Sequence, residues 1–392
     1  MLEESMPKQW LAPSIESDSF RTPQVIVHHE IMNQNIARMA EFAKRYQLNL
    51  RPHIKTHKTP EIALLQLQHG AKGFTCAKIS EAEALLSSPI LKGKKLSFLI
   101  AFPIVGESNY HRVLSLSQEA DILLMIDSVE QARRLQKFAL VHQTTFSVLI
   151  KINTGLNRCG IPVDAAILNE FVSEISLYSH LELIGIMTHA GHSYGATNQE
   201  EREQIARFEG ESMVSLHHSV YETLGINLPL VSVGSTPTVA ISGTIPGVNE
   251  IRPGNYVFND RTQVHLGSAR WSECALRVIS RVVSTPANNR WIIDAGSKTL
   301  ALDQGAHGKT GLVGFGHIVE HPHLQVARLS EEHGVLEGNP STPLHIGDLV
   351  EIIPNHACPV VNLTDHITVL KMGENKQVDF DTWRVRARGK NY

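Results

Sequence analysis

The sequence predicts an α/β protein in two parts: a (β/α)8 barrel of the TIM type over residues 22–265, and a smaller, mainly β domain over residues 266–392. In the first ~250 residues, short apolar runs alternate with stretches of helical spacing, as is typical of parallel strands joined by helices. After about residue 265 the helical patterns disappear and glycine, proline and asparagine become frequent, which indicates short strands and turns. A chain of 392 residues is also too long for one ordinary core.

Short apolar runs are the candidate strands of the barrel. They are Gln24–His28, Leu48–Pro52, Gly73–Cys76, Leu96–Ala101, Ile122–Ile126, Phe146–Ile152, Leu183–Met187 and Leu230–Val233, with Glu250–Arg252 as a ninth candidate. A helix between the first two strands is predicted by apolar residues at helical spacing, namely Met32, Ile36, Met39 and Ala43. Ser80 and Glu83 have the spacing of a capping box and predict a helix over Glu81–Ser87. An open doubly wound sheet is the alternative, although no strand precedes the GxGxxG turn that would favour it.

The second domain is expected to contain further strands without helices between them. The candidate runs are Cys274–Val283, Arg290–Asp294, Leu324–Leu329, Asp348–Ile353, His366–Met372 and Val378–Arg388. Residues 1–21 precede the first strand, and we expect them to pack on this β domain.

Composition excludes several classes of partner and location. The net charge is −3 and no basic run is longer than Lys94-Lys95, so neither nucleic acid nor an anionic membrane is expected as a partner. The longest apolar run, Leu96–Val105, is interrupted by Pro103 and reaches about half of the ~20 residues that a membrane helix needs. The N-terminal MLEESMPKQW is polar and acidic, unlike a secretory signal, so we expect a cytoplasmic protein. The four cysteines lie far apart, which argues against a disulfide framework.

Polar segments follow several of the predicted strands, where the loops of a barrel converge on one mouth. One of them, His53 to Lys58, contains two lysines. Lys55 has a histidine on either side, at His53 and His57, and a lysine near imidazoles in a closed mouth loses its proton more easily, as a nucleophilic amine must. From the residues alone, a solvated loop lysine stays the alternative for both Lys55 and Lys58.

The segment Gly234-Ser235-Thr236 follows the last long strand and offers backbone N–H groups and two hydroxyls. Such a turn after a late barrel strand suits a phosphate group, although a simple hydroxyl-capped turn is an equal alternative. The next loop could close the same pocket, because Gly254 permits close approach of the backbone and Tyr256 supplies a ring or a hydroxyl.

His356 and Cys358 follow a strand of the second domain and would point the same way along an extended chain. Imidazole together with thiolate favours zinc over magnesium or calcium. Two ligands leave the coordination sphere open, as a catalytic metal requires. The alternative is a buried cysteine beside a loop histidine.

Several motifs together resemble one enzyme family. The motifs are RPHIKTHK, THAGHSY, VSVGSTPT, EIRPGNYVFND, LSEEHG and PNHACPVVNL, and the match runs from about Thr22 to the C-terminus. The chain resembles the two-domain fold-type III pyridoxal-phosphate enzymes, which include D-serine dehydratase, D-threonine aldolase and related enzymes that act on D-3-hydroxyaspartate. The barrel is similar to that of alanine racemase.

The resemblance implies a role for each matching residue. Lys55 is implied as the lysine that holds pyridoxal 5'-phosphate as a Schiff base, and His356 and Cys358 as the ligands of a divalent metal. Zinc is expected, with manganese or magnesium as alternatives. The phosphate cradle and the groups around the cofactor ring and the substrate are implied at Gly234, Ser235, Thr236, Gly254, Asn255, Tyr256, Arg158, His189 and Tyr194.

The implied activity is that of a lyase that removes water from a D-3-hydroxy amino acid and gives a 2-oxo acid and ammonia. The substrate would be D-serine, D-threonine or D-threo-3-hydroxyaspartate. Aldolase members usually carry Asp where this chain has Cys358, and the HxC form resembles that of the zinc-dependent D-serine dehydratases. The alternatives are an aldolase that gives a glycine-type product and an aldehyde or glyoxylate, and a non-catalytic carrier of the cofactor. The resemblance also implies a homodimer.

Overall fold

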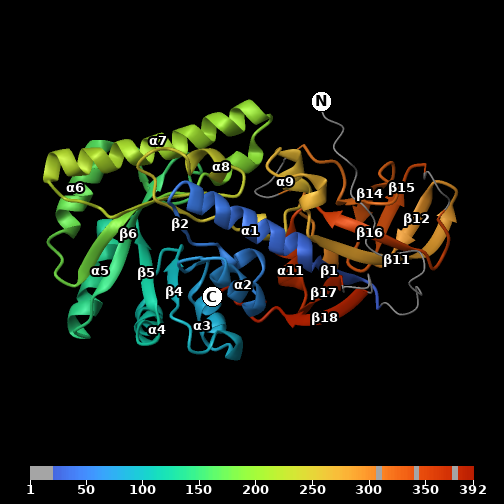
Figure 1. Cartoon of the computed structure of the whole chain (residues 1–392), viewed down its shortest axis with the longest axis horizontal. Helices are drawn as coiled ribbons and strands as arrows, with labels where there is room; N and C mark the ends of the chain where they lie inside the picture. The colour runs from blue at the N-terminus through green and yellow to red at the C-terminus, as the bar shows by residue number, and fades with distance from the viewer. Residues whose placement is uncertain (1–20, 306–310, 340–343, 373–377) are drawn as a thin grey trace.

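The computed structural model describes residues 21–305, 311–339, 344–372 and 378–392. Figure 1 shows a helix-covered barrel on one side and a β domain on the other, with the long helix α1 (His29–Arg45) running between them. None of the helices in these ranges combines the length and the apolar character that a membrane span requires.

The barrel is a ring of parallel strands. Its strand order is β2-β10-β9-β8-β6-β5-β4-β3. The strands are β2 (Asn49–Leu50), β3 (Phe74–Cys76), β4 (Ser97–Ile100), β5 (Asp121–Ile126), β6 (Phe146–Asn153), β8 (Leu181–Met187), β9 (Leu230–Val233) and β10 (Glu250–Ile251). A parallel bridge from His53 to Thr75 joins the two ends of this order, and the Thr75 N–H donates to the Pro52 carbonyl at 2.8 Å. The predicted (β/α)8 barrel is therefore confirmed, and an open sheet is excluded.

Alternate residues of the barrel strands enter different cores. Leu99, Leu149 and Met187 pack inside the barrel. Their neighbours Phe98 and Ile150 point outward and pack under the helices. Strands buried on both faces become continuous apolar runs, which is why the sequence showed runs without alternation.

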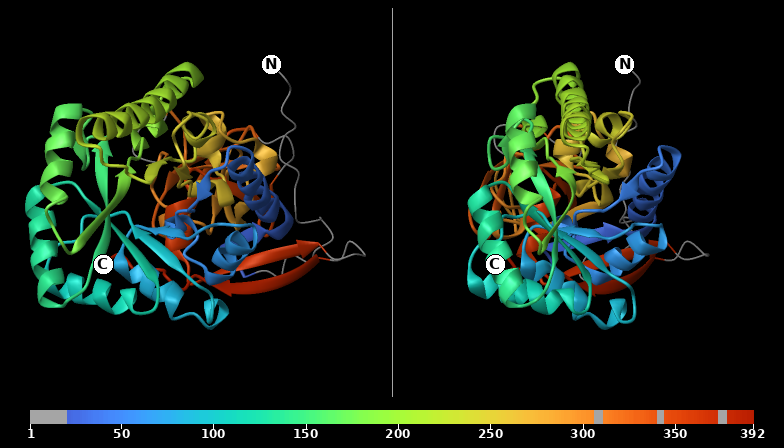
Figure 2. Two further views of the ribbon diagram at one scale, coloured as in Figure 1. Left: turned by 60° about the vertical axis from the view of Figure 1, so that its left-hand side comes forward. Right: turned by 90° about the vertical axis from the view of Figure 1, so that its left-hand side faces the viewer.

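Helices cover the outside of the barrel (Figure 2). After α1 they are α2 (Pro60–Gln68), α3 (Ile79–Leu86), α4 (Glu107–Ser117), α5 (Val129–Val141), α6 (Ala165–Ile175), α7 (Gln199–Leu224) and α8 (Val239–Ser242); the strand β7 (Ile161–Pro162) and the single turn η3 (Pro89–Leu91) lie in the connections. The short helix α9 (Arg261–His265) lies against the β domain. The apolar face predicted for α1 is buried, but it serves two cores. Met32 and Ile36 pack in the β domain, whereas Ala43 packs in the barrel.

The second domain is built on one sheet, which combines the N-terminal strand β1 with strands from the C-terminal third of the chain. Its strands are β1 (Gln24–His28), β11 (Leu276–Ala287), β12 (Arg290–Ile293), β13 (Gly316–Ile318), β14 (Gln325–Leu329), β15 (Gly334–Glu337), β16 (Leu349–Pro354), β17 (His366–Met372) and β18 (Val378–Arg384), with the short helices α10 (Ser297–Leu300) and α11 (Ala357–Leu363). Their order is β12-β15-β14-β13-β16-β11-β1-β17-β18, and a further pairing of β12 with β11 closes the first six into a small barrel. All pairings are antiparallel except that of β1 with β17.

Three expectations need correction. Gln24–His28 is not a barrel strand, because β1 lies between β11 and β17. The ninth candidate, Glu250–Arg252, supplies the eighth barrel strand as β10. Ser80 does not cap a helix that starts at Glu81: α3 begins at Ile79, and the Ser80 hydroxyl donates to the Tyr392 carbonyl at 2.5 Å.

The sequence missed β13 and β15 because each is too short to show a period of two. The expected packing of residues 1–21 falls, except for Arg21, outside the described residues, and the predicted domain boundary at 265/266 falls directly after α9.

Candidate active site

A cavity of about 290 Å³ lies where the barrel mouth meets α11. Most of the predicted site residues line it, namely Lys55, His189, Tyr194, Ser235, Thr236, Gly254, Asn255, His356 and Cys358. A narrower space of about 40 Å³ continues into the barrel and is lined by Lys55, His189, Arg158 and Gly234. Segments far apart in the sequence therefore converge on one site.

Lys55 lies on η2 (Ile54–Thr56), the single helical turn that follows β2. Its backbone N–H donates to the His53 Nδ1 at 3.4 Å, and this contact helps to fix the position of the lysine backbone. Burial lowers the pKa of Lys55, and the charge of Arg158 lowers it further, against the opposing effects of Cys358 and Glu81. An amine that loses its proton more easily is a better nucleophile and a better base.

Two further cations lie in the inner space, and neither was predicted as a cofactor-binding residue. Lys151 and Arg252 both line it, and both are buried. Burial, aided by the charge of Arg252, lowers the pKa of Lys151 to about 7. The signal for Lys151 was present, since a lysine interrupts the apolar run of β6. A pocket lined by several cationic groups favours an anionic ligand.

The predicted phosphate cradle has the backbone conformation that glycine permits. Gly234 has φ of +121°, and a Cβ there would lie 3.1 Å from the Arg252 backbone nitrogen. A Cβ on Gly254 would lie 3.1 Å from the Thr56 Oγ1. The buried Oδ1 of Asn255 has no hydrogen-bond partner within the described part of the chain. The two glycines therefore allow neighbouring segments to pack closely, and Asn255 leaves an unused hydrogen-bond acceptor beside the cavity.

Glu209 of α7 holds two of these loops and was also missed. Its Oε1 accepts from the backbone N–H groups of Ala190 at 3.0 Å and Gly234 at 3.1 Å, and its Oε2 accepts from the Thr238 hydroxyl at 2.7 Å. The His189 Nδ1 is in turn 3.0 Å from the Gly234 carbonyl. One fully buried carboxylate thus ties the loop after β8 to the loop after β9.

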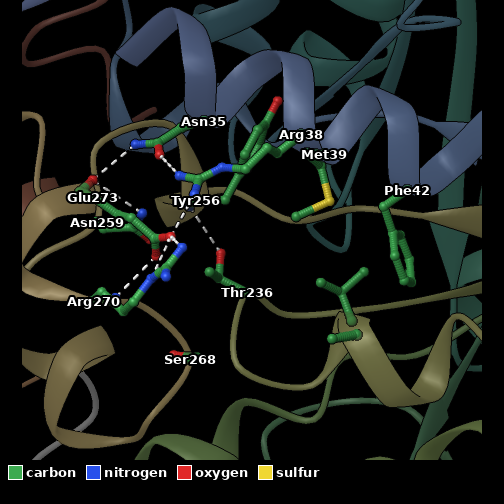
Figure 3. Close-up of a pocket in the computed structure, with 12 residues that line it drawn as sticks. Asn35, Arg38, Met39, Phe42, Thr236, Tyr256, Asn259, Ser268, Arg270 and Glu273 are labelled. Atoms are coloured by element: carbon green, nitrogen blue, oxygen red, sulfur yellow. Dashed lines mark hydrogen bonds and ion pairs between the residues drawn. The ribbon is translucent and has the colours of Figure 1, made fainter. Parts of the chain in front are cut away.

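Tyr256 lies behind the cradle and does not line the cavity. Its backbone N–H donates to the Thr236 Oγ1 at 3.2 Å, and its hydroxyl is 3.0 Å from the Gln66 Nε2. Tyr256 and Thr236 instead border a second cavity of about 350 Å³ beside α1, where they face Asn35 and Arg38 (Figure 3). Tyr256 therefore supports the cradle from outside.

His356 and Cys358 come together, but not on an extended chain. His356 is the N-cap of α11, and Cys358 lies in the first turn of that helix. The two side chains are close enough that each shifts the pKa of the other. The Asp303 Oδ2 is 2.7 Å from the His356 Nδ1, which leaves the Nε2 for the thiol or for a metal. The Cys358 thiol also donates to the Thr56 Oγ1 at 3.3 Å, so the pair adjoins the Lys55 turn.

The electrostatics of this pair suit a cation between its atoms. Burial alone would raise the pKa of Cys358, but the charge and hydrogen bond of His356 bring it below its ordinary value. Burial would lower the pKa of His356, and Cys358 and Asp303 raise it to about 10. In the ranges that the structure describes, no three His, Cys, Asp or Glu side chains cluster as metal ligands. A metal held by this pair would keep open positions.

Two protein families match this chain, one in each part. The family described as "Alanine racemase, N-terminal domain" matches residues 27–262, and the family described as "Putative serine dehydratase domain" matches residues 275–370. D-threo-3-hydroxyaspartate dehydratase of Delftia sp. (strain HT23) is 29% identical over 86% of this chain and 90% of its own length. D-serine dehydratase of Dictyostelium discoideum is 28% identical over 87% of this chain and 91% of its own.

Solved structures agree with these matches. D-threonine aldolase from Filomicrobium marinum superposes with a TM-score of 0.84 at 26% identity, over 96% of this chain and 98% of its own. A variant of the D-threo-3-hydroxyaspartate dehydratase, described as the metal-free form, superposes with a TM-score of 0.83 at 28% identity, over 94% and 98%. The chain therefore belongs to the fold-type III pyridoxal-phosphate family in which an alanine racemase N-terminal domain is joined to a serine dehydratase domain.

Proposed function

We propose that this protein is a metal-dependent pyridoxal-phosphate lyase that removes water from a D-amino acid with a β-hydroxyl group, giving a 2-oxo acid and ammonia. D-serine is the first candidate substrate, and D-threonine and D-threo-3-hydroxyaspartate are the others. The observation that carries the proposal is the contact between the two predicted centres: Cys358 reaches Thr56, the residue next to Lys55, across one cavity.

The residues present fit both groups. Lys55 would hold the cofactor, and the cradle of Gly234, Ser235 and Thr236 would receive its phosphate. His356 and Cys358 would hold the metal, and their imidazole and thiolate favour zinc. When bound, the cofactor supplies an electron sink and the metal a Lewis acid.

The chain's own groups then account for binding and proton transfer. Lys55 Nζ, with its lowered pKa, takes the α-proton of the substrate. The cations around the inner space, including Arg158 and Arg252, attract the anionic groups of cofactor and substrate. The buried Thr56 contacts Cys358, so the groups that would act on the β-hydroxyl and on the α-proton lie in the same cavity.

Lys55→Ala is the direct test. We expect loss of the visible absorbance of the bound cofactor and loss of turnover, because the amine that would anchor the cofactor is removed. Lys58→Met is the matched control: that lysine points to Asn362 and Asn391, so this variant should keep the absorbance. A Lys55→Ala protein that keeps the absorbance, or a Lys58→Met protein that loses it, contradicts the assignment.

Product analysis decides between the two lyase reactions. The aldolase alternative is favoured by the close superposition on D-threonine aldolase. D-serine gives pyruvate and ammonia in the dehydratase reaction, and glycine and formaldehyde in the aldolase reaction. A chelator should abolish turnover while the visible absorbance stays, and added Zn²⁺ should restore turnover. A non-catalytic carrier would produce neither set of products. The cytoplasmic location and the homodimer stay predictions.

A further inference from the structure

Asp260 ends the motif EIRPGNYVFND and has no part in the proposed chemistry, yet it is fully buried. It is the N-cap of α9, where its Oδ1 accepts from the Gln263 backbone N–H at 3.0 Å. An exposed serine or asparagine would suffice for that task. Capping α9 therefore does not explain why a charged residue is buried at this position.

The second carboxylate oxygen of Asp260 joins two parts of the active site. It accepts from the Asn255 Nδ2 at 2.5 Å and from the Ala357 backbone N–H at 2.9 Å. Asn255 lies in the cofactor cradle, and Ala357 stands between the two predicted metal ligands. A single oxygen atom thus connects the loop that would hold the cofactor with the first turn of the helix that would hold the metal.

The chemistry of these contacts requires a carboxylate. All three partners of Asp260 are N–H donors, and an ionised carboxylate only accepts hydrogen bonds. An asparagine of the same shape would place an NH₂ group against at least one of these donors. Hydrogen bonds from N–H groups to a carboxylate are strong enough to offset much of the cost of burial.

Neighbouring contacts hold the same helix from the same side. The Thr262 hydroxyl and backbone N–H both donate to the Asn355 carbonyl, at 2.6 and 3.2 Å, and Asn355 directly precedes His356. The ring of His356 is held by Asp303. The backbone of the metal pair is therefore positioned by the segment that continues the cofactor cradle.

We infer that Asp260 is a positioning residue that fixes the His356–Cys358 pair relative to the cofactor cradle through Ala357 and Asn255. This inference rests on the proposed metal site. Residues that orient metal ligands from behind typically change metal affinity by about 10–100-fold when they are replaced.

The test is the dissociation constant of Zn²⁺, measured by competition with a chromophoric chelator on metal-stripped protein that retains its cofactor. Asp260→Asn should raise this constant by about 10–100-fold. The visible absorbance at saturating pyridoxal phosphate should remain, because Lys55 is untouched. Asp164→Asn is the matched control: Asp164 caps α6 by the same contact, at 3.0 Å to the Ile167 N–H, and its loss should leave the zinc constant unchanged.

An Asp260→Asn protein with native zinc affinity overturns the inference. If Asp260→Asn does not fold, Asn255→Ala decides, since it keeps both helix contacts of Asp260 and removes its link to the cradle, together with the Asn255 Oδ1 at the cavity. We then expect a zinc dissociation constant several-fold higher, and an unchanged constant again overturns the inference. A separate comparison of the unmutated protein with Cys358→Ala tests the metal site itself: equal zinc affinity there would refute that part of the proposed function.

Discussion

Single charged residues inside the barrel mouth have roles that their sequence neighbours do not reveal. Glu209, Asp260 and Lys151 are each almost fully buried, and the first two accept backbone N–H groups from loops that lie far away in the sequence. A glutamate on a long helix is usually solvated, so nothing in the helical pattern of α7 marks Glu209 as an organiser of two loops. Its importance follows from burial, which only the fold supplies.

Lys151 gives a prediction about pH. Its pKa in the folded protein is about 7, below the ordinary value of 10.5. Below pH 7, Lys151 carries a proton in both the folded and the unfolded protein, and burial of its charge lowers the free energy of unfolding. Above pH 7, Lys151 is protonated in the unfolded chain but not in the folded protein. The free energy of unfolding therefore rises with pH in this range. We expect the melting temperature of the cofactor-free protein, relative to that of Lys151→Met, to rise between pH 6.5 and 9. A difference that stays constant over this range would contradict this environment for Lys151.

At the scale of elements, the last residues of the chain act as part of the barrel wall. The Lys58 Nζ donates to the Asn362 Oδ1 at 2.8 Å and to the Asn391 Oδ1 at 3.0 Å, and the Ser80 N–H donates to the Tyr392 carbonyl. Together with the Gly389 N–H, which donates to the Asn362 Oδ1 at 3.3 Å, these contacts connect the tail with the lysine turn, with α11 and with α3. Asn391 thereby lines the cavity, although its position in the sequence gives no sign of that.

Asn391→Ala tests the tail. Removal of the amide should cost about 1 kcal/mol of unfolding free energy and raise the KM for D-serine several-fold, because Lys58 and the cavity wall lose a fixed partner. Asn169→Ala is the matched control, since its amide donates at 3.1 Å to the Ser219 hydroxyl, away from the cavity. Urea unfolding and steady-state kinetics measure both quantities. A KM that is unchanged in Asn391→Ala, or raised equally in Asn169→Ala, would exclude this role.

At the scale of the whole molecule, the chain crosses between its two parts more than once. From β1 in the β domain it passes along α1 into the barrel, returns through β11, and finally reaches the barrel again with its last residues. Removing the segment 22–265, which includes β1, would expose the edges of β11 and β17, and removing the β domain would expose the apolar face of α1. The two parts therefore depend on each other for stability.

This arrangement predicts cooperative unfolding. We expect one transition in differential scanning calorimetry, with equal calorimetric and van't Hoff enthalpies, because neither core is complete without the shared helix and strand. Scans of the cofactor-free protein avoid a contribution from ligand binding. Two resolved transitions would show that the barrel and the β domain unfold independently.

The sequence predicted the features that depend on local pattern. Strand and helix periods, the change of texture near residue 265 and the chemical types at Lys55, His356 and Cys358 all lie in short segments, so they could be interpreted without a fold. The family motifs then identified the barrel and its cofactor. The side chains of Arg158 and His189 were placed at the same mouth for that reason, and both line its inner space.

By itself, then, the sequence determined most of the strands, the cofactor family that the chain belongs to, and the atoms that could bind a metal. Only the tertiary structure decided that Gln24–His28 joins the β domain, that Tyr256 lies behind the cradle, and that Asp260 bridges cradle and metal pair. The physical reason is that a periodic pattern reports that a face is buried, but not which partner buries it. A hydrogen bond to a distant backbone N–H leaves no trace in the local sequence.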